Sequence, residues 1–254
     1  MIPDNEDVIV IDKYVKSADA PVNDNSHYKG LRVHALNGLH EFIVDKIKNN
    51  FKLNSFVLDL GAGTGAMSLR LSELGFNVTA ADIVPNNFKL HEVVPFIKVN
   101  LNDTFSCSFE KQFNGIVAIE IIEHLENPRK FLRECYKLTK SGGMLIMSTP
   151  NIDNPVSKAS FFRNGTFQWY SDNDYEEHGH ITPIPQWLLK KCISESKFNL
   201  EWIGTFGDPF AYTKKWWKIR LFAQLMQLFS IADKSLNGEI SIVVLRKPYD
   251  SEKS

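Results

Sequence analysis

A strand-like segment of this sequence ends in three alternating glycines. The stretch V-L-D-L-G-A-G-T-G runs from Val57 to Gly65, and Asp59 lies two residues before the first glycine. Glycine lets the backbone turn sharply and lets a ligand approach the main chain, and a helix N-terminus supplies free N–H groups. The spacing departs from the dinucleotide pattern G-x-G-x-x-G, and Asp59 would repel a pyrophosphate. The loop therefore predicts a ligand site in which Asp59 can pair with an ammonium group, such as that of a bound amino acid.

A second acid ends the next apolar segment, F-N-V-T-A-A-D. This residue, Asp82, lies 17 residues beyond Gly65. An acid at the end of the second strand, about 20 residues after a glycine loop, is placed to accept hydrogen bonds from a ribose. Together with the loop before it, Asp82 is predicted to hold a ribose.

Two acids and a histidine lie in E-I-I-E-H-L-E-N-P, which runs from Glu120 to Pro128. His124 is a candidate general base, because the unperturbed pKa of histidine is about 6.5 and a neighbouring Glu123 is expected to raise it. We therefore take His124 and Glu123 as the candidate catalytic residues.

Alternating strands and helices must position these residues. Apolar runs predict strands at 55–60, 76–82, 95–100, 115–120, 144–148, 200–206 and 239–246. Helical patterns cover 35–50, 65–74, 185–197 and 213–231, and a further helix opens at Asn127–Pro128 and is stopped by Gly142–Gly143. Continuous apolar strands separated by helices imply an α/β fold, a doubly wound, seven-stranded, mostly parallel sheet covered on both faces. Such sheets bind ligands beyond the carboxyl ends of their strands.

From about Ser55 to Arg246, the chain resembles the class I S-adenosylmethionine-dependent methyltransferases, with a Rossmann-like fold that ends in an antiparallel strand pair. D-L-G-A-G-T-G matches the first motif of that family. The resemblance implies S-adenosylmethionine as cofactor and S-adenosylhomocysteine as product. Asp82 would then hold the ribose and Glu120 would touch the cofactor. The methionyl part would lie on Asp59, Gly61, Gly63 and Gly65, and the adenine on Ile83, Asn100 and Leu101.

The E-x-x-E-H stretch resembles that of ubiquinone-biosynthesis O-methyltransferases and their small-molecule relatives. A similar stretch with a later histidine binds metal in small-RNA 2′-O-methyltransferases, so Glu120, Glu123, His124 and His180 are an alternative metal set. Two carboxylates and imidazole suit a divalent cation only loosely. We therefore expect no metal, with Glu123 and His124 bracing the loop or removing a proton.

The expected function is methyl transfer to a small acceptor, at a hydroxyl of a sugar, glycolipid or quinol-like compound. The alternatives are a metal-dependent RNA 2′-O-methyltransferase and a cofactor-binding scaffold without catalysis. The chain has a net charge of −1 over 254 residues, which provides no global basic field for nucleic acid.

The expected organisation is an N-terminal arm at 1–34, one methyltransferase domain at 35–249 and a tail at 250–254. Within the domain, 150–185 is expected to form a lid, because it lacks clear periodicity, and 208–237 a helical insert. Trp169 and the other aromatic residues of the lid are candidates to line an acceptor site or to form a small core of the lid itself. The insert carries four cations and no acid between Lys214 and Phe229, beside a broad apolar face. It predicts either weak membrane-surface contact, or burial on the sheet or against a second subunit of a homodimer.

Three well-separated cysteines argue against a disulfide framework and fit a reducing cytosol. The N-terminal segment lacks the apolar run of a secretory signal. We therefore expect a cytoplasmic protein, with the insert able to bring it to the inner face of the membrane.

Overall fold

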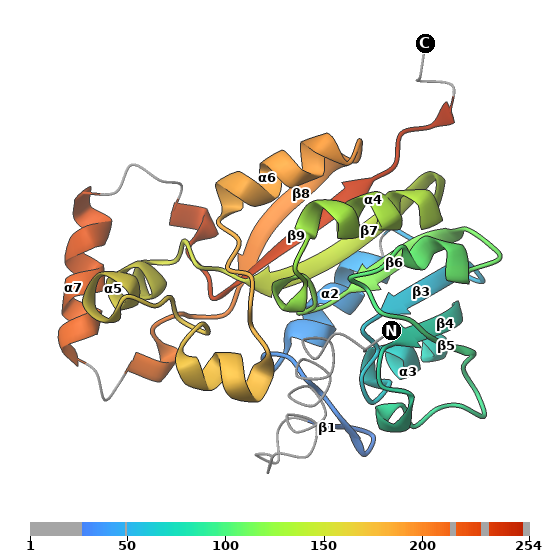
Figure 1. Cartoon of the computed structure of the whole chain (residues 1–254), viewed down its shortest axis with the longest axis horizontal. Helices are drawn as coiled ribbons and strands as arrows, with labels where there is room; N and C mark the ends of the chain where they lie inside the picture. Colours follow the sequence, from blue (N-terminus) through green and yellow to red (C-terminus); the bar gives the residue numbers. More distant parts are fainter. Residues whose placement is uncertain (1–26, 49, 214–216, 230–233, 251–254) are drawn as a thin grey trace, which may run out of the picture.

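The computed structural model describes residues 27–48, 50–213, 217–229 and 234–250. A seven-stranded sheet in the order β5-β4-β3-β6-β7-β9-β8 runs through its centre (Figure 1). Its neighbouring strands are parallel, except that β9 is antiparallel to both β7 and β8. This arrangement confirms the predicted doubly wound, mostly parallel sheet. The strands are β3 (Phe56–Leu60), β4 (Asn77–Asp82), β5 (Phe96–Lys98), β6 (Phe113–Ala118), β7 (Thr139–Pro150), β8 (Asn199–Phe206) and β9 (Ile240–Arg246).

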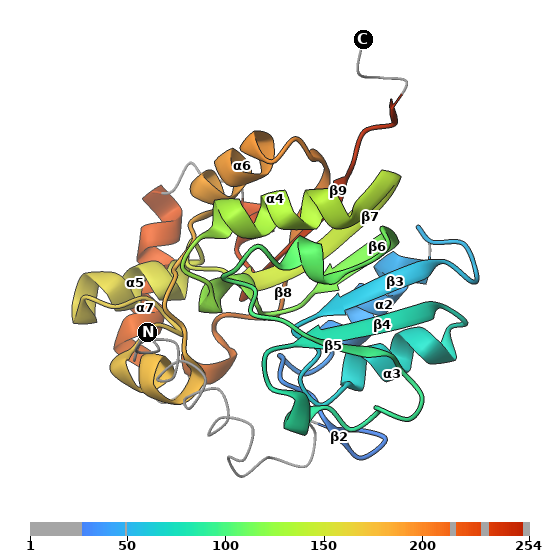
Figure 2. The same cartoon turned by 45° about the vertical axis from the view of Figure 1, so that its right-hand side comes forward.

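Two apolar cores cover the two faces of this sheet. One core contains buried residues of α2 and α3, and the other contains buried residues of α4 and α6 (Figure 2). Each of these helices turns an apolar stripe to the sheet because its apolar residues recur three or four positions apart. The helices are α2 (Leu39–Lys48), α3 (Ala66–Glu73), α4 (Pro128–Leu138) and α6 (Gln186–Glu195).

The end of α4 differs from the prediction. Asn127 caps the start of the helix as expected, and its side chain accepts a hydrogen bond from the Lys130 N–H at 2.9 Å. However, the helix ends at Leu138, and Gly142–Gly143 lies inside β7. A Cβ at Gly143 would lie 2.9 Å from the backbone oxygens of Asn114 in β6 and of Lys140 in β7 itself. The glycine therefore permits a close approach of backbones within the sheet rather than stopping the helix.

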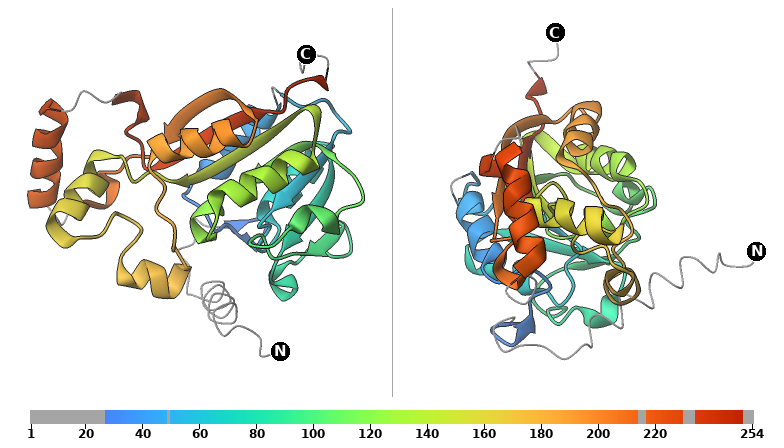
Figure 3. Two further views of the ribbon diagram at one scale, coloured as in Figure 1. Left: turned by 45° about the horizontal axis from the view of Figure 1, so that its top comes forward. Right: turned by 90° about the vertical axis from the view of Figure 1, so that its left-hand side faces the viewer.

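Residues 150–185 contain regular structure that their sequence did not predict. Helix α5 (Pro155–Asn164) begins at Asn154, whose side chain accepts from the Ser157 N–H, and ends at Gly165 with φ +79°. A π-helical turn follows at Asp174–His178. Helix α5 packs on α7 (Trp217–Phe229) rather than on the sheet, and the two helices lie beyond the sheet in Figure 3. The segment lacks a clear apolar pattern because the buried positions of α5 include small and polar residues such as Ser157 and Ala159.

The described part of the predicted N-terminal arm is docked on the domain. A hairpin, β1 (His27–Tyr28) and β2 (Leu31–Arg32), lies beside α3, where the Tyr28 hydroxyl donates to Glu73 at 2.6 Å. Residues 1–26 of the arm, 251–254 of the tail, and Lys214, Lys215 and Trp216 of the insert lie outside the described residues.

Candidate active site

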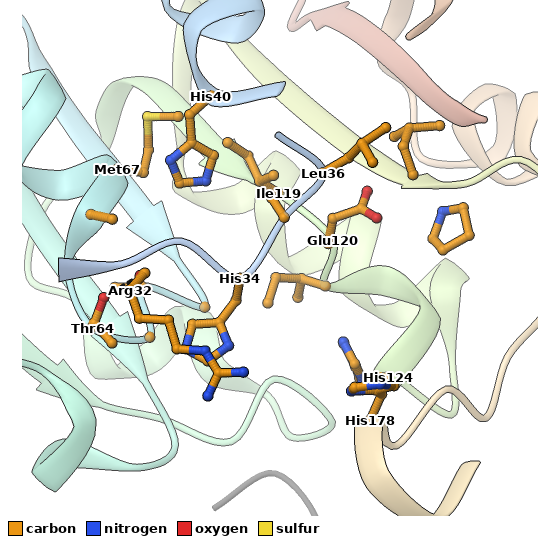
Figure 4. A pocket seen from close by; sticks show the side chains of 18 of the residues that line it. Arg32, His34, Leu36, His40, Thr64, Met67, Ile119, Glu120, His124 and His178 are labelled. Carbon is orange, nitrogen blue, oxygen red and sulfur yellow. Dashed lines mark hydrogen bonds between the residues drawn. The ribbon is translucent and has the colours of Figure 1, made fainter. Parts of the chain in front are cut away.

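Two cavities meet at the carboxyl ends of the central strands. The larger has a volume of about 380 Å³, and its wall is drawn in Figure 4. The smaller, of about 70 Å³, lies towards β4 and β5. Four residues line both cavities and so mark their junction, namely Gly61, Ile121, His124 and His178.

The smaller cavity brings together the residues predicted to hold an adenosine. Asp82, Ile83, Asn100 and Leu101 all line it. The buried Asp82 carboxylate accepts hydrogen bonds from the backbone N–H groups of Gly63, at 2.8 Å, and of the nearby Val84, at 3.0 Å. Asp82 therefore fixes the glycine loop in addition to facing the cavity, a link that the sequence did not predict.

The side-chain amide of Asn100 already makes one hydrogen bond within its own loop. Its side-chain oxygen accepts from the backbone N–H of Asn102 at 3.0 Å. A carbonyl oxygen has two lone pairs. Asn100 therefore keeps one acceptor site for an adenine amine.

The larger cavity contains part of the glycine loop at one end. Asp59, Gly61 and Gly63 line it. Asp59 is buried and accepts from the Ser68 hydroxyl, and burial raises the pKa of its carboxyl to about 6. An ammonium group of a ligand would offset this desolvation. An acid in that position therefore fits the amino-acid end of S-adenosylmethionine.

Two glycines of the loop have different structural roles. Gly61 has φ +72°, and a Cβ there would lie 2.0 Å from the side chain of Ile121, so close packing requires glycine. Gly65 has φ +96° and begins α3, where a Cβ would meet Phe88 and Leu90 at 2.9 Å. Gly65 is absent from both cavity walls described above, so its role here is packing behind the loop.

Glu120 lies at the junction of β6 with the larger cavity. Its backbone has φ +52°, a conformation that costs energy in a residue other than glycine and is common at functional sites. Its side chain accepts from the Ser148 hydroxyl at 2.7 Å. Burial and the nearby Glu239 raise the pKa of Glu120 to about 7.

Glu123 lies behind the cavity wall rather than in it. Its side chain is fully buried, and burial raises its pKa well above the usual range. Its backbone carbonyl accepts from the N–H groups of Ile181, at 3.0 Å, and Thr182, at 2.9 Å. The E-x-x-E-H segment thus holds the end of the lid against the site.

His124 lies at the junction of the cavities, and its Nδ1 is 3.1 Å from the carbonyl oxygen of Gly179. The expectation that Glu123 raises its pKa is wrong. Burial and the neighbouring His180 lower the pKa of His124 to about 3. The imidazole is therefore neutral over the physiological range, and a base with so low a pKa takes up a proton less readily than an exposed histidine.

Three of the four alternative metal ligands come together. One ligand atom each from Glu123, His124 and His180 lie within 4.8 Å of one another. Neither carboxylate oxygen of Glu123 has a hydrogen-bond partner among the described residues. The fourth, Glu120, is absent from this group and instead bonds Ser148. The three residues fit a cation such as Zn²⁺ better than one that prefers six oxygen ligands.

The cavity wall also contains residues that sequence reasoning missed. Arg32 and His34 come from the end of the predicted arm, and His40 comes from α2 (Figure 4). Glu239 directly precedes β9. Trp169, in contrast, is one of the lid aromatics that the sequence offered as acceptor-site candidates, and it lines the cavity. No motif or spacing links these positions to the glycine loop, so only the fold brings them to the site.

The comparisons with known proteins identify the family. A family model described as "Methyltransferase domain" matches residues 34–201. The chain belongs to this methyltransferase family. The fold and the glycine loop place it among class I S-adenosylmethionine-dependent methyltransferases, as the sequence predicted.

Named relatives extend this assignment. The methyltransferase is 34% identical over 127 residues to a ubiquinone biosynthesis O-methyltransferase of Rickettsia bellii, covering 47% of this chain and 53% of the relative. It is 30% identical over 223 residues to the protein of that name from Rickettsia prowazekii, covering 82% and 84%. The chain thus spans about half the length of the first of these relatives.

A solved structure shows the shared fold. A SAM-dependent methyltransferase from Archaeoglobus fulgidus has a TM-score of 0.56 and 19% identity, and the match covers 82% of this chain and 94% of that one. At this identity the likeness concerns the fold alone.

Proposed function

We propose that this methyltransferase transfers a methyl group from S-adenosylmethionine to a hydroxyl oxygen of a small acceptor. The observation that carries the proposal is the position of His124 at the junction of the two cavities. One cavity has the residues that suit an adenosine. The other continues past the glycine loop to Glu120, Trp169 and Glu239, with room for an acceptor.

The cofactor is proposed to lie across the junction. Asp82 accepts from the ribose hydroxyls, and Asn100 accepts from the adenine amine between Ile83 and Leu101. Asp59 pairs with the ammonium group beside Gly61 and Gly63, and Gly65 supports the loop from behind. Arg32 lines the same cavity and has the charge that a carboxylate group requires. Glu120 lies beside the methionyl part.

The chain's own residues then align the acceptor and remove a proton. Bound S-adenosylmethionine supplies an electrophilic methyl on a sulfonium, so the protein's main contribution is alignment of the acceptor oxygen with that methyl. The neutral imidazole of His124 accepts the hydroxyl proton as the oxygen attacks. Glu123, close behind it, is proposed to hold the His124 segment in place, because its backbone carbonyl accepts from the N–H groups of Ile181 and Thr182.

A second candidate mechanism is supported by the unpartnered oxygens of Glu123. If Glu123, His124 and His180 held a divalent cation, the cation would lower the pKa of a bound acceptor hydroxyl. The RNA 2′-O-methyltransferase alternative would use such a centre, although the net charge of −1 gives it no support. The names of the ubiquinone relatives support a quinol-like acceptor, and the sugar and glycolipid acceptors stay proposals beside it.

The His124→Gln variant tests the catalytic proposal and the scaffold alternative together. We expect normal affinity for S-adenosylhomocysteine by calorimetry, because glutamine keeps a hydrogen-bonding group. We expect transfer into an accepted hydroxyl substrate to fall by about 10²- to 10⁴-fold, the usual effect of losing a general base. Wild-type binding without transfer to any of a broad panel of hydroxyl acceptors would favour the scaffold. Unchanged transfer in the variant would remove His124 from the mechanism.

We also propose that α7 gives the enzyme weak contact with an anionic membrane surface. No helix among the described residues is long and apolar enough to cross a membrane. Helix α7 instead turns apolar side chains outward, with Trp217 64% exposed and Leu228 74% exposed. The exposed Lys218 and Arg220 lie near its start. This arrangement suits an interfacial helix at the inner membrane face. A homodimer through the same helix is the competing proposal.

A further inference from the structure

The larger cavity extends well beyond the space that a methionyl group needs. In the sheet, β3 carries the glycine loop, and β6, β7 and β9 follow in order. Neighbouring strands lie about 4.8 Å apart, so Glu239, next to β9, is about 10 Å along the sheet from Glu120, next to β6. Both residues line this one cavity. Its far end therefore belongs to the acceptor rather than to the cofactor.

Glu239 is a buried acid with an unused hydrogen-bonding atom at this far end. The residue is only 1% exposed, and its Oε1 has no hydrogen-bond partner among the described residues. Burial raises the pKa of this carboxyl to about 7, against an opposing hydrogen bond from Trp169. A buried oxygen without a partner costs free energy, which a donor on a bound molecule would recover.

Trp169 lines the cavity beside Glu239 in an unusual backbone conformation. Its φ is +68°, in the left-handed region that side chains rarely adopt. The residues on both sides hold it there, because the Gln168 N–H donates to the Ser157 hydroxyl and the Tyr170 hydroxyl donates to the Thr182 carbonyl. Strain that is maintained from both sides is common where a side chain must meet a ligand.

We infer that Glu239 and Trp169 form an acceptor subsite for a saccharide ring. Glu239 would accept a hydrogen bond from a ring hydroxyl remote from the methylated one, and the Trp169 indole would cover the apolar face of the ring. This inference rests on the proposed function, because it assumes that His124 marks the reacting oxygen.

The other groups in the cavity favour hydroxyls over an ammonium ion. Arg32 and several histidines share the wall with the two acids. A hydroxyl both donates and accepts, so a polyol can satisfy carboxylates and imidazoles at once. A quaternary ammonium ion offers neither a donor nor an acceptor to the histidines of this wall.

The test uses the full chain saturated with S-adenosylhomocysteine. The probes are methyl α-glucoside, methyl α-mannoside, cyclohexanol and choline, each followed by saturation-transfer NMR and titration. We expect a hexoside to bind and cyclohexanol and choline not to bind. In Glu239→Gln, hexoside affinity should fall by about ten-fold or more, and in Glu239→Asp it should fall less. Trp169→Leu should also weaken it, whereas the exposed control Glu110→Gln should match wild type.

Several outcomes would overturn the inference. These are no hexoside binding to the loaded wild type, equal binding of cyclohexanol, preference for choline, or hexoside affinity unchanged in both Glu239→Gln and Trp169→Leu. Calorimetry of S-adenosylhomocysteine with each variant keeps this result separate from the proposed function. Loss of that binding in wild type would contradict the cofactor proposal, whereas retained binding without a hexoside response contradicts only the subsite.

Discussion

Asp82 has two roles, contact with the cofactor cavity and support of the glycine loop, and the sequence predicted only the first. Its carboxylate faces the smaller cavity and also accepts the backbone N–H groups of Gly63 and Val84. Asp82→Ala should therefore lose a charged hydrogen bond to ribose and also loosen the glycine loop. A hydrogen bond to a charged group contributes about 1.5–3 kcal/mol, so affinity for S-adenosylhomocysteine should fall roughly 10- to 150-fold. Calorimetry measures this, with the exposed Glu92→Gln as the matched control. Unchanged affinity would show that Asp82 only supports the loop.

Glu123 separates the two mechanisms at the residue scale. The carboxyl is buried with both oxygens unpartnered among the described residues, so it is either protonated or bound to a cation. We expect it to be protonated, because Glu120 bonds Ser148 and leaves only three candidate ligands. Transfer activity should then be the same before and after prolonged dialysis against a chelator.

A different outcome of the chelator experiment would support a metal-dependent mechanism. Activity lost on dialysis and restored by Zn²⁺ or Mn²⁺, together with bound metal in elemental analysis of the untreated enzyme, would replace the proton-transfer proposal. A Glu123→Gln variant should then lose the bound metal. If the carboxyl is protonated, as we expect, this variant should keep its activity within a few-fold.

At the scale of elements, α7 presents a row of exposed apolar side chains that its packing on α5 does not use. Ile219 and Ala223 are buried between the helices, while Trp217, Leu221 and Leu228 are at least half exposed. Each nearby Lys or Arg adds about 1 kcal/mol of attraction to an anionic surface. The wild-type enzyme should therefore co-sediment with anionic vesicles, bind neutral vesicles weakly, and release in high salt.

A matched pair of triple variants tests this helix. Trp217→Ser/Leu221→Ser/Leu228→Ser should lose vesicle binding. Leu53→Ser/Val93→Ser/Trp187→Ser removes comparably exposed apolar side chains elsewhere and should bind like wild type. Sedimentation velocity without lipid tests the competing proposal that α7 forms a homodimer interface. A dimer that dissociates only in the α7 variant, with no vesicle binding by wild type, would assign this face to a second copy of the chain.

The elements also show which parts of the fold a sequence can reveal. Strands β3, β4 and β6 and helices α3 and α4 form near their predicted positions, because each buries a regular apolar pattern against its sequence neighbours. Helix α5 was not predicted, since its buried positions include small and polar residues such as Ser157 and Ala159 rather than forming an apolar stripe. Gly142–Gly143 was misinterpreted because a glycine pair can end a helix or let strands approach closely.

At the scale of the whole molecule, the candidate site also contains residues that the sequence could indicate and residues that it could not. Asp59, Asp82 and His124 lie in motifs whose spacing has a physical reason, and all three line a cavity. Glu239 and Trp169 line the larger cavity too. The sequence offered no motif signal for Glu239, and Trp169 was only one of several aromatic candidates in the lid. They arrive through the antiparallel return of β9 and the packing of the lid, which are long-range properties of the fold.

The stability of the whole molecule should reflect two opposing sets of buried groups. Burial lowers the pKa of His40 and His124 to about 3, below the usual 6.5, so their stabilisation is present above pH 6.5 and is lost as the pH falls. Burial raises the pKa of Glu120 and Glu239 to about 7, above the usual 4.5. Their stabilisation is present below pH 4.5 and is lost as the pH rises through 7. Between pH 5.5 and 7.5 the two sets therefore change stability in opposite directions.

Removing one member of each set should tilt this balance in opposite directions. Between pH 5.5 and 7.5 the wild type loses the stabilisation that Glu239 provides at low pH, and Glu239→Gln has no such stabilisation to lose. The change in the free energy of unfolding over this pH range should therefore be about 2 kcal/mol more positive in Glu239→Gln than in wild type. Over the same pH range the wild type gains stability as the free-energy cost of keeping His40 neutral disappears, and His40→Gln lacks this gain. The change in its free energy of unfolding should therefore be about 1 kcal/mol less positive than in wild type. Urea unfolding at the two pH values measures both differences without bound cofactor. If the change in the free energy of unfolding with pH equals that of wild type in both variants, these groups titrate at ordinary pKa values. Water would then reach the cavity freely when no ligand is bound.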